Sequence, residues 1–301
     1  AAGTGLSSHE LNQPGTYKDV KDTSVVAMFK AILSKESQFI FDAAAANPLS
    51  KEVFYMAWTT TPWTLPSNLG LTVGPNIEYT LISTYNPYTA MPVNVIVAKA
   101  LVSKYFKEEG LSLTSFAEGD KIVPWKELAT FKGSELEHTK YTRPFDFIEI
   151  ENAHYVVLAD YVTVEDGTGL VHQSPAFGAD DLEVCRKYNL PVVNPIEPDG
   201  HFKKEVALVG GVFFKEADKA LIKDLKSRNL MFKSSQFEHS YPHCWRCHTA
   251  LMYYAQPSWY IKTTSIKKDL LRENSKTDWH PETIKTGRFG DWLNNNIDWA
   301  V

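Results

Sequence analysis

The sequence has few cysteines, no long apolar run and no excess of basic residues. Its 301 residues include only three cysteines, Cys185, Cys244 and Cys247. An odd count of this kind does not make a disulfide framework and favours a reducing compartment. No apolar run approaches the roughly 18 residues that a membrane span needs, and residues 1–11 lack the basic flank and apolar stretch of a signal peptide. We therefore expect a cytoplasmic protein without a membrane partner.

The charge balance limits how the chain can contact nucleic acid. Its 31 basic and 36 acidic side chains give a net charge of −5. A protein that holds long nucleic acid by electrostatics alone is basic, so any such contact here is local or shared with a partner. The composition, 44% hydrophobic and 22% charged, is that of an ordinary globular protein. The length fits about two domains or one large one.

Several common catalytic motifs are absent. The chain has no Gly-x-x-x-x-Gly-Lys-Ser/Thr phosphate loop, no Gly-x-Ser-x-Gly elbow and no His-Glu-x-x-His zinc helix. The triplet Gly167-Thr168-Gly169 is not a dinucleotide fingerprint, because the third glycine position holds His172. These absences argue against an enzyme driven by ATP or NAD, and no cofactor is expected.

Most of the chain reads as short strands with few helices between them. Runs rich in β-branched and aromatic residues, bounded by Pro, Gly or Asn, predict strands. Apolar residues at helical spacing predict helices. Many short strands favour a mostly β fold of the α+β class, with a closed β-barrel core and peripheral helices. The predicted strands are 24–33, 52–59, 70–73, 78–84, 93–98 and 155–158, and the predicted helices are 178–189, 216–229, 266–274 and 281–296.

The stretch 58–68, Trp-Thr-Thr-Thr-Pro-Trp-Thr-Leu-Pro-Ser-Asn, is the most unusual one. Its plainer interpretation is a strand followed by a turn, with the hydroxyls satisfying backbone groups. The two prolines fix the backbone locally, so the hydroxyls are held in set directions. Such hydroxyls can orient a water or a polar substrate, but nucleophilic attack is not indicated because no base is adjacent.

A second run, 167–181, carries His172 and ends in Asp180 and Asp181. A lone histidine after an apolar strand is more often structural than catalytic, and acids in a first helical turn are common. Alternatively, strand, turn and helix start place His172 and Asp181 at one rim, where a carboxylate can hold an ammonium group. The spacing alone does not decide between these interpretations.

Together the two runs resemble the editing domain of isoleucyl-tRNA synthetase, the connective insertion of the class I enzymes for isoleucine, valine and leucine. The motif Thr59-Thr60-Thr61-Pro62-Trp63-Thr64 resembles the isoleucine type, whereas the valine and leucine relatives carry a Thr-Thr-Arg-Pro form. The resemblance continues in three further runs and covers nearly the whole chain; its Cys-x-x-Cys is similar to that of the eukaryote-like branch. These runs are 175–181 (Pro-Ala-Phe-Gly-Ala-Asp-Asp), 240–247 (Ser-Tyr-Pro-His-Cys-Trp-Arg-Cys) and 288–293 (Arg-Phe-Gly-Asp-Trp-Leu).

The resemblance implies a β-barrel editing domain over residues 1–232. Residues 233–301 would then carry the Cys-x-x-Cys segment and the return connection to an absent catalytic domain. It implies hydrolysis of the ester of mischarged Val-tRNA(Ile), with rejection of Ile-tRNA(Ile). The partners are the valine-carrying 3′ end of tRNA(Ile) and the rest of the synthetase. The chain lacks His-Ile-Gly-His-like and Lys-Met-Ser-Lys-Ser-like signatures, so we expect an excised piece, monomeric, that does not make aminoacyl-tRNA.

The resemblance also implies roles for individual residues. Asp181 would bind the substrate's α-ammonium group, and His172 would line the side-chain pocket and block a longer chain. The remaining site residues would surround the ester and the hydrolytic water, so catalysis would rest on positioning and oxyanion-type stabilisation. These residues are the catalytic Thr59, Thr60, Thr61 and Thr64, with Trp58 and Asn68 as binding and supporting residues.

Two alternatives stay open. The pair Cys244 and Cys247 supplies two of the four ligands of a structural zinc site, so we expect no bound metal, but a metal-dependent hydrolase using them and a nearby histidine is one alternative. The other is a non-catalytic tRNA-binding module whose basic residues contact phosphates. Charged runs of this kind are more often a solvated face. The basic residues concerned are Lys203, Lys204, Lys267, Lys268 and Arg272.

Overall fold

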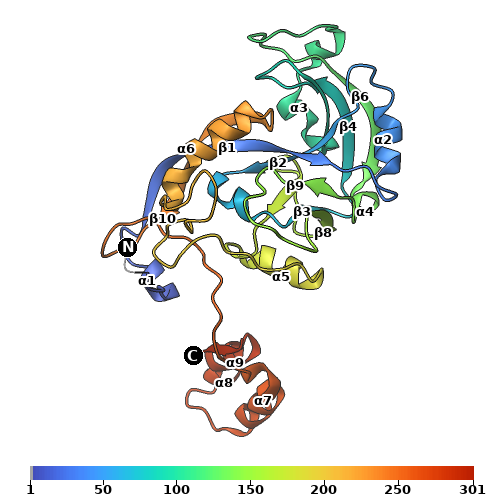
Figure 1. Cartoon of the computed structure of the whole chain (residues 1–301). Helices are drawn as coiled ribbons and strands as arrows, with labels where there is room; N and C mark the ends of the chain where they lie inside the picture. Colours follow the sequence, from blue (N-terminus) through green and yellow to red (C-terminus); the bar gives the residue numbers. More distant parts are fainter. Residues whose placement is uncertain (1–2) are drawn as a thin grey trace. The chain divides into compact units, whose positions relative to one another are not determined.

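The structure is a computed structural model that describes residues 3–301. The chain divides into two compact units, Ala1–Ala255 and Gln256–Val301 (Figure 1). No helix within 3–301 is long and apolar enough to cross a membrane. The expected boundary at residue 232, between the editing domain and the Cys-x-x-Cys segment with its return connection, stays a prediction. The division into compact units does not say what role either part has.

Strands dominate the larger unit. Its strands are β1 (Tyr17–Ala31), β2 (Val53–Thr59), β3 (Gly70–Val73), β4 (Glu78–Tyr85), β5 (Pro92–Ala98), β6 (Trp125–Lys132), β7 (Tyr141–Thr142), β8 (Tyr155–Leu158), β9 (Leu170–Gln173) and β10 (Met231–Pro242). Its α-helices are α1 (Ser8–Leu11), α2 (Gln38–Ala44), α3 (Val102–Tyr105), α4 (Gly133–Leu136), α5 (Ala179–Lys187) and α6 (Phe214–Ser227). Its 3₁₀ turns are η1 (Pro62–Ser67), η2 (Lys99–Leu101) and η3 (Glu108–Ser112).

The strands form two open sheets rather than a barrel. The main sheet has the order β10-β1-β2-β5-β4-β6, with β7 paired to β1, and a second sheet has the order β8-β3-β9. Across residues 3–301 neither sheet closes on itself, so the predicted closed β-barrel core is wrong. The fold is a mixed α/β arrangement of open sheets.

The ladder around β2 shows why closure fails. Strand β2 pairs with β5 only over Val53–Tyr55, in parallel, while its antiparallel pairing with β1 continues to Thr59. Its last residues leave β5 and approach β9 without a ladder between them. The turn that follows begins at Pro62, which has no amide hydrogen to donate. The short strands predicted a barrel, but their register leaves no hydrogen-bonded ladder between the two sheets.

Helices cover the sheets and complete one large core. Helix α2 packs on β4 and β6, and α6 packs on β1, β10 and η1 (Figure 1). The buried face of α6 carries Phe214, Ala217, Leu221 and Leu225, at the spacing that predicted this helix. A smaller core beneath α5 joins Val184 and Cys185 to Val157 of β8. Helix α5 is therefore fixed against the second sheet.

The smaller unit is mainly helical. The predicted helix 281–296 is interrupted at Gly287, where α8 ends and α9 begins. Its elements are β11 (Tyr260–Ile261), η4 (Thr263–Ile266), α7 (Lys267–Lys276), α8 (Thr283–Thr286), α9 (Arg288–Asn294) and β12 (Trp299–Ala300).

Candidate functional site

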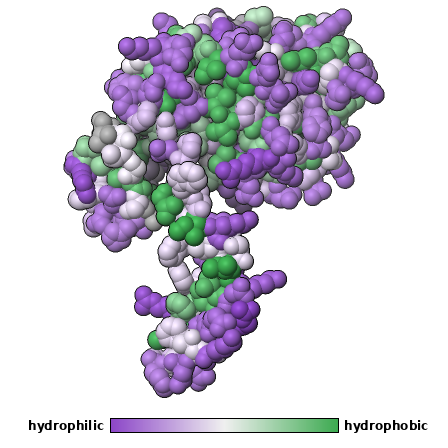
Figure 2. Space-filling model, turned by 60° about the horizontal axis from the view of Figure 1, so that its bottom comes forward, coloured by the Kyte–Doolittle hydropathy of each residue, from purple (hydrophilic) through white to green (hydrophobic). Residues whose placement is uncertain are grey.

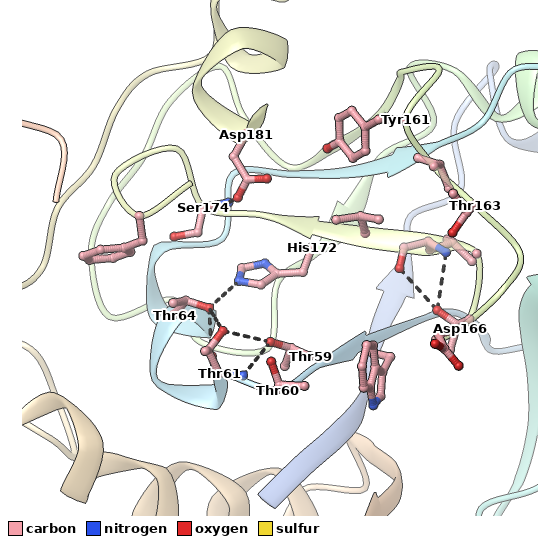
Figure 3. Close-up of a pocket in the computed structure, with 18 residues that line it drawn as sticks. Thr59, Thr60, Thr61, Thr64, Tyr161, Thr163, Asp166, His172, Ser174 and Asp181 are labelled. Carbon is pink, nitrogen blue, oxygen red and sulfur yellow. Dashed lines mark hydrogen bonds between the residues drawn. The ribbon is translucent and has the colours of Figure 1, made fainter. Parts of the chain in front are cut away.

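A cavity of about 410 Å³ lies where β2, η1, β9 and the start of α5 meet. This volume is in the range of small-molecule sites. Figure 3 shows Thr59, Thr60, Thr61 and Thr64 on one side, Asp181 and Tyr161 on the other, and His172 between them. Of the residues predicted for the site, only Asn68 is not part of the wall. Those that line the cavity are Trp58, Thr59, Thr60, Thr61, Thr64, His172 and Asp181.

The threonines sit on a rigid turn. Strand β2 ends at Thr59, and the 3₁₀ turn η1 follows with prolines at positions 62 and 66. The backbone N–H of Thr61 donates to Thr59 Oγ1 at 3.0 Å, and the two hydroxyl oxygens lie 3.2 Å apart. The Thr60 side chain has no hydrogen-bond partner among residues 3–301. Its hydroxyl is therefore available to a substrate or water.

His172 is locked by a chain of hydrogen bonds that fixes its tautomer. The Tyr141 hydroxyl donates to Asn68 Oδ1 at 2.6 Å, which orients the amide. Asn68 Nδ2 then donates to His172 Nδ1 at 2.8 Å. The imidazole proton must therefore be on Nε2, which lies 3.0 Å from Thr64 Oγ1 and donates to it, while the Thr64 hydroxyl donates to Thr61 O at 2.8 Å.

These contacts separate the roles of the predicted residues. Thr64 and Asn68 hydrogen-bond to His172 and hold its ring in place. Burial lowers the pKa of His172 to about 4, so its ring is neutral at physiological pH. Both nitrogens of this neutral ring are engaged in hydrogen bonds. The ring can therefore limit the space in the cavity, but it is not poised to act as a general base.

Two acidic residues line the cavity, and Asp181 is less exposed than Asp166. It lies in the first turn of α5, and its Oδ2 accepts a hydrogen bond from the Ser174 backbone N–H at 2.8 Å. Burial raises the pKa of its carboxyl to about 6, and neighbouring Asp180 adds to this rise. Gly178 leaves room for the group, because a Cβ there would stand 3.0 Å from the carboxylate. At neutral pH the cavity therefore contains a partly desolvated negative charge, which suits a cationic ligand.

The structure adds residues that the sequence did not indicate. Tyr161 lines the cavity beside Asp181, and its hydroxyl accepts a hydrogen bond from Gln173 Nε2 at 2.6 Å. Tyr141 orients Asn68 from 73 positions away. Ser174 was in the quoted run, but its backbone contact with Asp181 has no sequence signature. No motif marked either tyrosine.

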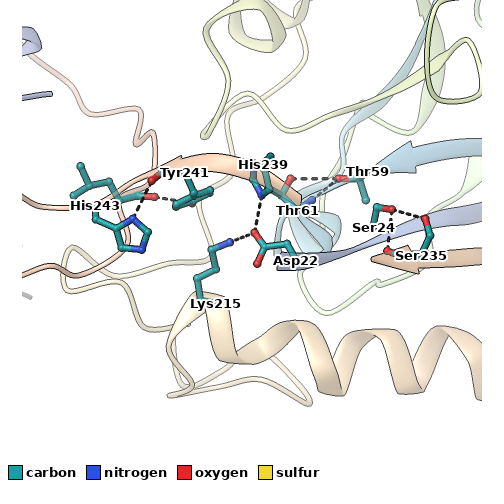
Figure 4. Close-up of polar contacts among 10 residues, drawn as sticks. Asp22, Ser24, Thr59, Thr61, Lys215, Ser235, His239, Tyr241 and His243 are labelled. Carbon is teal, nitrogen blue, oxygen red and sulfur yellow. Dashed lines mark hydrogen bonds and ion pairs between the residues drawn. The ribbon is translucent and has the colours of Figure 1, made fainter. Parts of the chain in front are cut away.

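A polar cluster supports the turn that carries the threonines. Asp22 of β1 forms an ion pair with Lys215 of α6, and its Oδ2 lies within hydrogen-bond distance of His239 Nε2 of β10, at 2.9 Å (Figure 4). The Lys215 ammonium also lies 3.9 Å from the centre of the Tyr241 ring. Because α6 contacts η1, this cluster ties the main sheet to the helix that underlies the threonine turn.

Comparison with known proteins identifies the family. A family model described as tRNA synthetases class I (I, L, M and V) matches residues 3–301. The chain belongs to this family. The resemblance predicted from the threonine and His–Asp runs is thereby confirmed.

Two curated relatives of this class I synthetase chain are isoleucine–tRNA ligases. That of Streptomyces coelicolor is 52% identical over 301 residues, and that of Thermobifida fusca is 50% identical over 300. Each alignment covers 99% of this chain and 25% of the relative. The chain therefore spans about a quarter of the length of these ligases.

Solved structures share the fold at low sequence identity. The crystal structure of GlLeuRS-CP1 has a TM-score of 0.52 and 14% identity, covering 70% of this chain and 97% of that one. The P. falciparum cytosolic leucyl-tRNA synthetase editing domain has a TM-score of 0.50 and 13% identity, with coverages of 70% and 98%. These likenesses establish the fold alone.

The Cys-x-x-Cys segment of this synthetase chain forms a tight turn after β10. The N–H of Cys244 donates to Thr249 O, and the N–H of His248 donates back to Cys244 O, each at 2.8 Å. Within residues 3–301 no three side chains of His, Cys, Asp or Glu converge as a metal site would require. The alternative of a metal-dependent hydrolase built on these cysteines therefore has no ligand set in the described part of the chain.

The cysteines should differ sharply in reactivity. Hydrogen bonds with Thr249 lower the pKa of the exposed Cys247 thiol to about 7, whereas burial raises the pKa of Cys185 to about 12. Iodoacetamide at pH 7.5 should therefore label Cys247 rapidly and Cys185 only after unfolding, since the thiolate is the reacting form. Peptide mass spectrometry over time measures this. Thr249→Val should slow the labelling of Cys247. Equally fast labelling of Cys185 in the native protein would contradict the predicted difference in thiol reactivity.

Proposed function

We propose that this chain performs post-transfer editing: it hydrolyses the ester of mischarged Val-tRNA(Ile) and rejects Ile-tRNA(Ile). The observation that carries the proposal is the single cavity in which the threonine turn, the fixed His172 ring and the Asp181 carboxylate face one another. Similarity to isoleucine–tRNA ligases and to a leucyl-tRNA synthetase editing domain supports it.

The physical need for such a site follows from the limits of side-chain discrimination. One methylene in an apolar pocket is worth about 1–3 kcal/mol, and isoleucine against valine is the standard example of this limit. A second site that admits valine and excludes isoleucine turns the extra methylene into a steric clash. The whole cavity is too large to exclude isoleucine by volume, so we assign the exclusion locally to His172.

The proposed chemistry relies on positioning. Asp181 anchors the α-ammonium group, and this fixes the ester over the threonines. The hydroxyls of Thr59, Thr60 and Thr61 orient the water and the developing oxyanion, together with the free ribose hydroxyl of the terminal nucleotide. Thr64 and Asn68 contribute through His172, and Trp58 forms the side wall of the cavity.

The basic residues named for the non-catalytic RNA-binding alternative are divided between the two units. Lys203 and Lys204 lie in the larger unit, whereas Lys267, Lys268 and Arg272 belong to α7 of the smaller one. Arg272 is paired with Asp269 at 2.6 Å and with Glu273 at 3.0 Å. Arg272 therefore has acidic partners on its own helix, although α7 as a whole carries four basic and two acidic side chains.

We propose that the remainder of the synthetase is the second partner, and that it contacts the smaller unit. Several large apolar side chains of that unit are exposed, including Trp259 at 84% and Ile297 at 75%. Figure 2 shows apolar residues among charged ones on its surface. Exposed apolar area of this kind marks contact surfaces, and the chain spans only a quarter of its relatives.

A deacylation assay tests the proposed function. Acceptor-stem RNA charged with valine or with isoleucine is incubated with the chain in the presence of a chelator, and free amino acid is followed over time. Valine should be released at least about tenfold faster than isoleucine, as one excluded methylene implies. Equal rates would refute the specificity, and loss of hydrolysis on chelation would favour the metal-dependent alternative.

A further inference from the structure

Two buried serine hydroxyls join the two walls of the cavity. Ser67 ends the threonine turn η1, and Ser174 directly follows β9. Their Oγ atoms lie 2.5 Å apart, and both side chains are almost completely buried. Ser174 lines the cavity beside Asp181 (Figure 3), whereas Ser67 is not part of the lining. We call Ser67 and Ser174 the serine pair; the sequence gave neither of them a role.

The directions of the hydrogen bonds in the serine pair follow from a count of protons. Ser67 Oγ lies 2.8 Å from Thr64 O, and a carbonyl oxygen can only accept, so Ser67 donates there. A serine hydroxyl has one proton, so Ser67 accepts in its contact with Ser174, and Ser174 donates. The backbone N–H of Ser174 also donates to Asp181 Oδ2 at 2.8 Å. Ser174 therefore holds the threonine turn with its side chain and the carboxylate with its backbone.

The serine pair lies just beyond the end of a backbone ladder. Strands β3 and β9 pair as far as Gly70 and Gln173, and Leu69 N–H donates to Gln173 O at 3.0 Å. Pro175, two residues after β9, has no amide hydrogen with which to continue the ladder. From there the serine pair carries the connection between η1 and the turn that leads to α5.

This connection lies between the proposed anchor and the proposed barrier. Ser67 holds the carbonyl of Thr64, and the Thr64 hydroxyl accepts from His172 Nε2 at 3.0 Å. On the other side, Ser174 holds Asp181. A continuous path of hydrogen bonds therefore runs from the carboxylate to the imidazole ring. A substrate whose ammonium is held at one end of this path meets the ring at the other end.

We propose that the serine pair is a specificity-determining brace, which fixes the spacing between Asp181 and His172 so that the longer side chain is excluded. The inference rests on the proposed function and adds two positioning residues to it. A steric barrier discriminates only if it does not yield, and a site needs its groups held to within about 0.5 Å by side chains that are themselves locked. Without the bond between the serines, the threonine turn and the carboxylate can separate, and room for one more methylene opens.

Ser174→Ala tests the brace. It removes the donating hydroxyl but keeps the backbone N–H that holds Asp181, and Ser67 keeps its bond to Thr64 O. The Val-to-Ile ratio of kcat/KM on charged acceptor-stem RNA should fall about fivefold, the equivalent of one hydrogen bond, chiefly through faster hydrolysis of the isoleucyl ester. Ser67→Ala should lower the ratio at least as much. Adding Ser174→Ala to it should lower the ratio no further, because the bond is already broken.

Tyr55→Phe is the matched control. The Tyr55 hydroxyl donates to Thr139 Oγ1 at 2.8 Å, and Thr139 donates in turn to Leu136 O at 2.6 Å. This arrangement repeats that of the serine pair, and both Tyr55 and Thr139 are fully buried, but neither lines the cavity. Tyr55→Phe should lower the Tm about as much as Ser174→Ala does and leave the Val-to-Ile ratio unchanged.

Amide hydrogen exchange measures the brace without any substrate. Peptides that cover 61–68 should exchange faster in Ser174→Ala than in the wild type or in Tyr55→Phe. The inference is overturned if Ser174→Ala keeps the wild-type ratio, if Tyr55→Phe lowers the ratio equally, or if exchange over 61–68 is unchanged. If the wild type hydrolyses neither ester, the proposed function fails and the specificity role fails with it, while exchange still decides whether the serines hold the turn.

Discussion

Asp181→Asn should greatly slow hydrolysis of valyl esters while leaving the fold intact. The amide keeps an oxygen that can accept the Ser174 N–H, but it removes the charge that we propose anchors the substrate ammonium. Losing one partner of a desolvated charge pair costs about 2–5 kcal/mol, so kcat/KM should fall by about 30-fold to 4,000-fold. Deacylation of Val-charged acceptor-stem RNA measures this loss.

The same substitution should not destabilise the protein. Burial raises the pKa of Asp181 to about 6, above its ordinary value of 3.8, so the folded state holds this proton more tightly than the unfolded state does. Any stability this proton contributes is present below pH 4 and is lost as the pH rises through 6. At pH 7.5 the asparagine variant should therefore unfold at the same temperature as the wild type, or higher. A lowered Tm together with lost activity would leave a structural role as the better explanation.

The pH profile supplies a second readout for Asp181. In the free protein, kcat/KM should fall as the pH drops through about 6, because the protonated carboxyl no longer attracts an ammonium group. Asp180→Asn is the matched control: it is the adjacent, exposed acid of the same helix and does not line the cavity. That variant should retain activity. Near-wild-type hydrolysis by Asp181→Asn would discard the anchor.

The sequence predicted those strands whose own residues carry the signal. Strands β2, β3, β4 and β5 are short, apolar and bounded by turn residues, and they lie where the pattern placed them. Strand β10 was missed because its exposed, polar sequence is a strand only through its pairing with β1. The first residues of β1 are charged and were missed for the same reason. The barrel was wrong because closure depends on register between distant strands, which no local pattern contains.

The site shows the same division between local and distant information. The threonine turn and the His–Asp run each have a local signature, and the resemblance joined them. Asn68 hydrogen-bonds to His172 across 104 positions of sequence, and Tyr141 orients Asn68 across 73. A sequence pattern could suggest that a histidine borders the cavity. It could not show that the ring is neutral, held on both nitrogens and therefore suited to be a wall.

His172→Ala should give the largest change in selectivity. Removing the ring opens the cavity beside the threonines, so an isoleucyl ester should enter and be hydrolysed. The Val-to-Ile ratio of kcat/KM should fall by about 10-fold to 100-fold, the discrimination that one methylene provides. The rates are compared on acceptor-stem RNA charged with each amino acid.

The substitution also has a structural cost that must be separated from selectivity. It leaves Asn68 Nδ2 and the Thr64 hydroxyl each without their imidazole partner, so stability should fall by about 2–4 kcal/mol. His154→Asn is the matched control, because His154 also has a pKa lowered to about 4 by burial and contacts Asn68, but does not line the cavity. Asparagine tolerates the positive φ of 67° at that position. If both variants lose stability but only His172→Ala hydrolyses Ile-tRNA, the ring is the steric barrier; unchanged selectivity in His172→Ala would move that role to another residue.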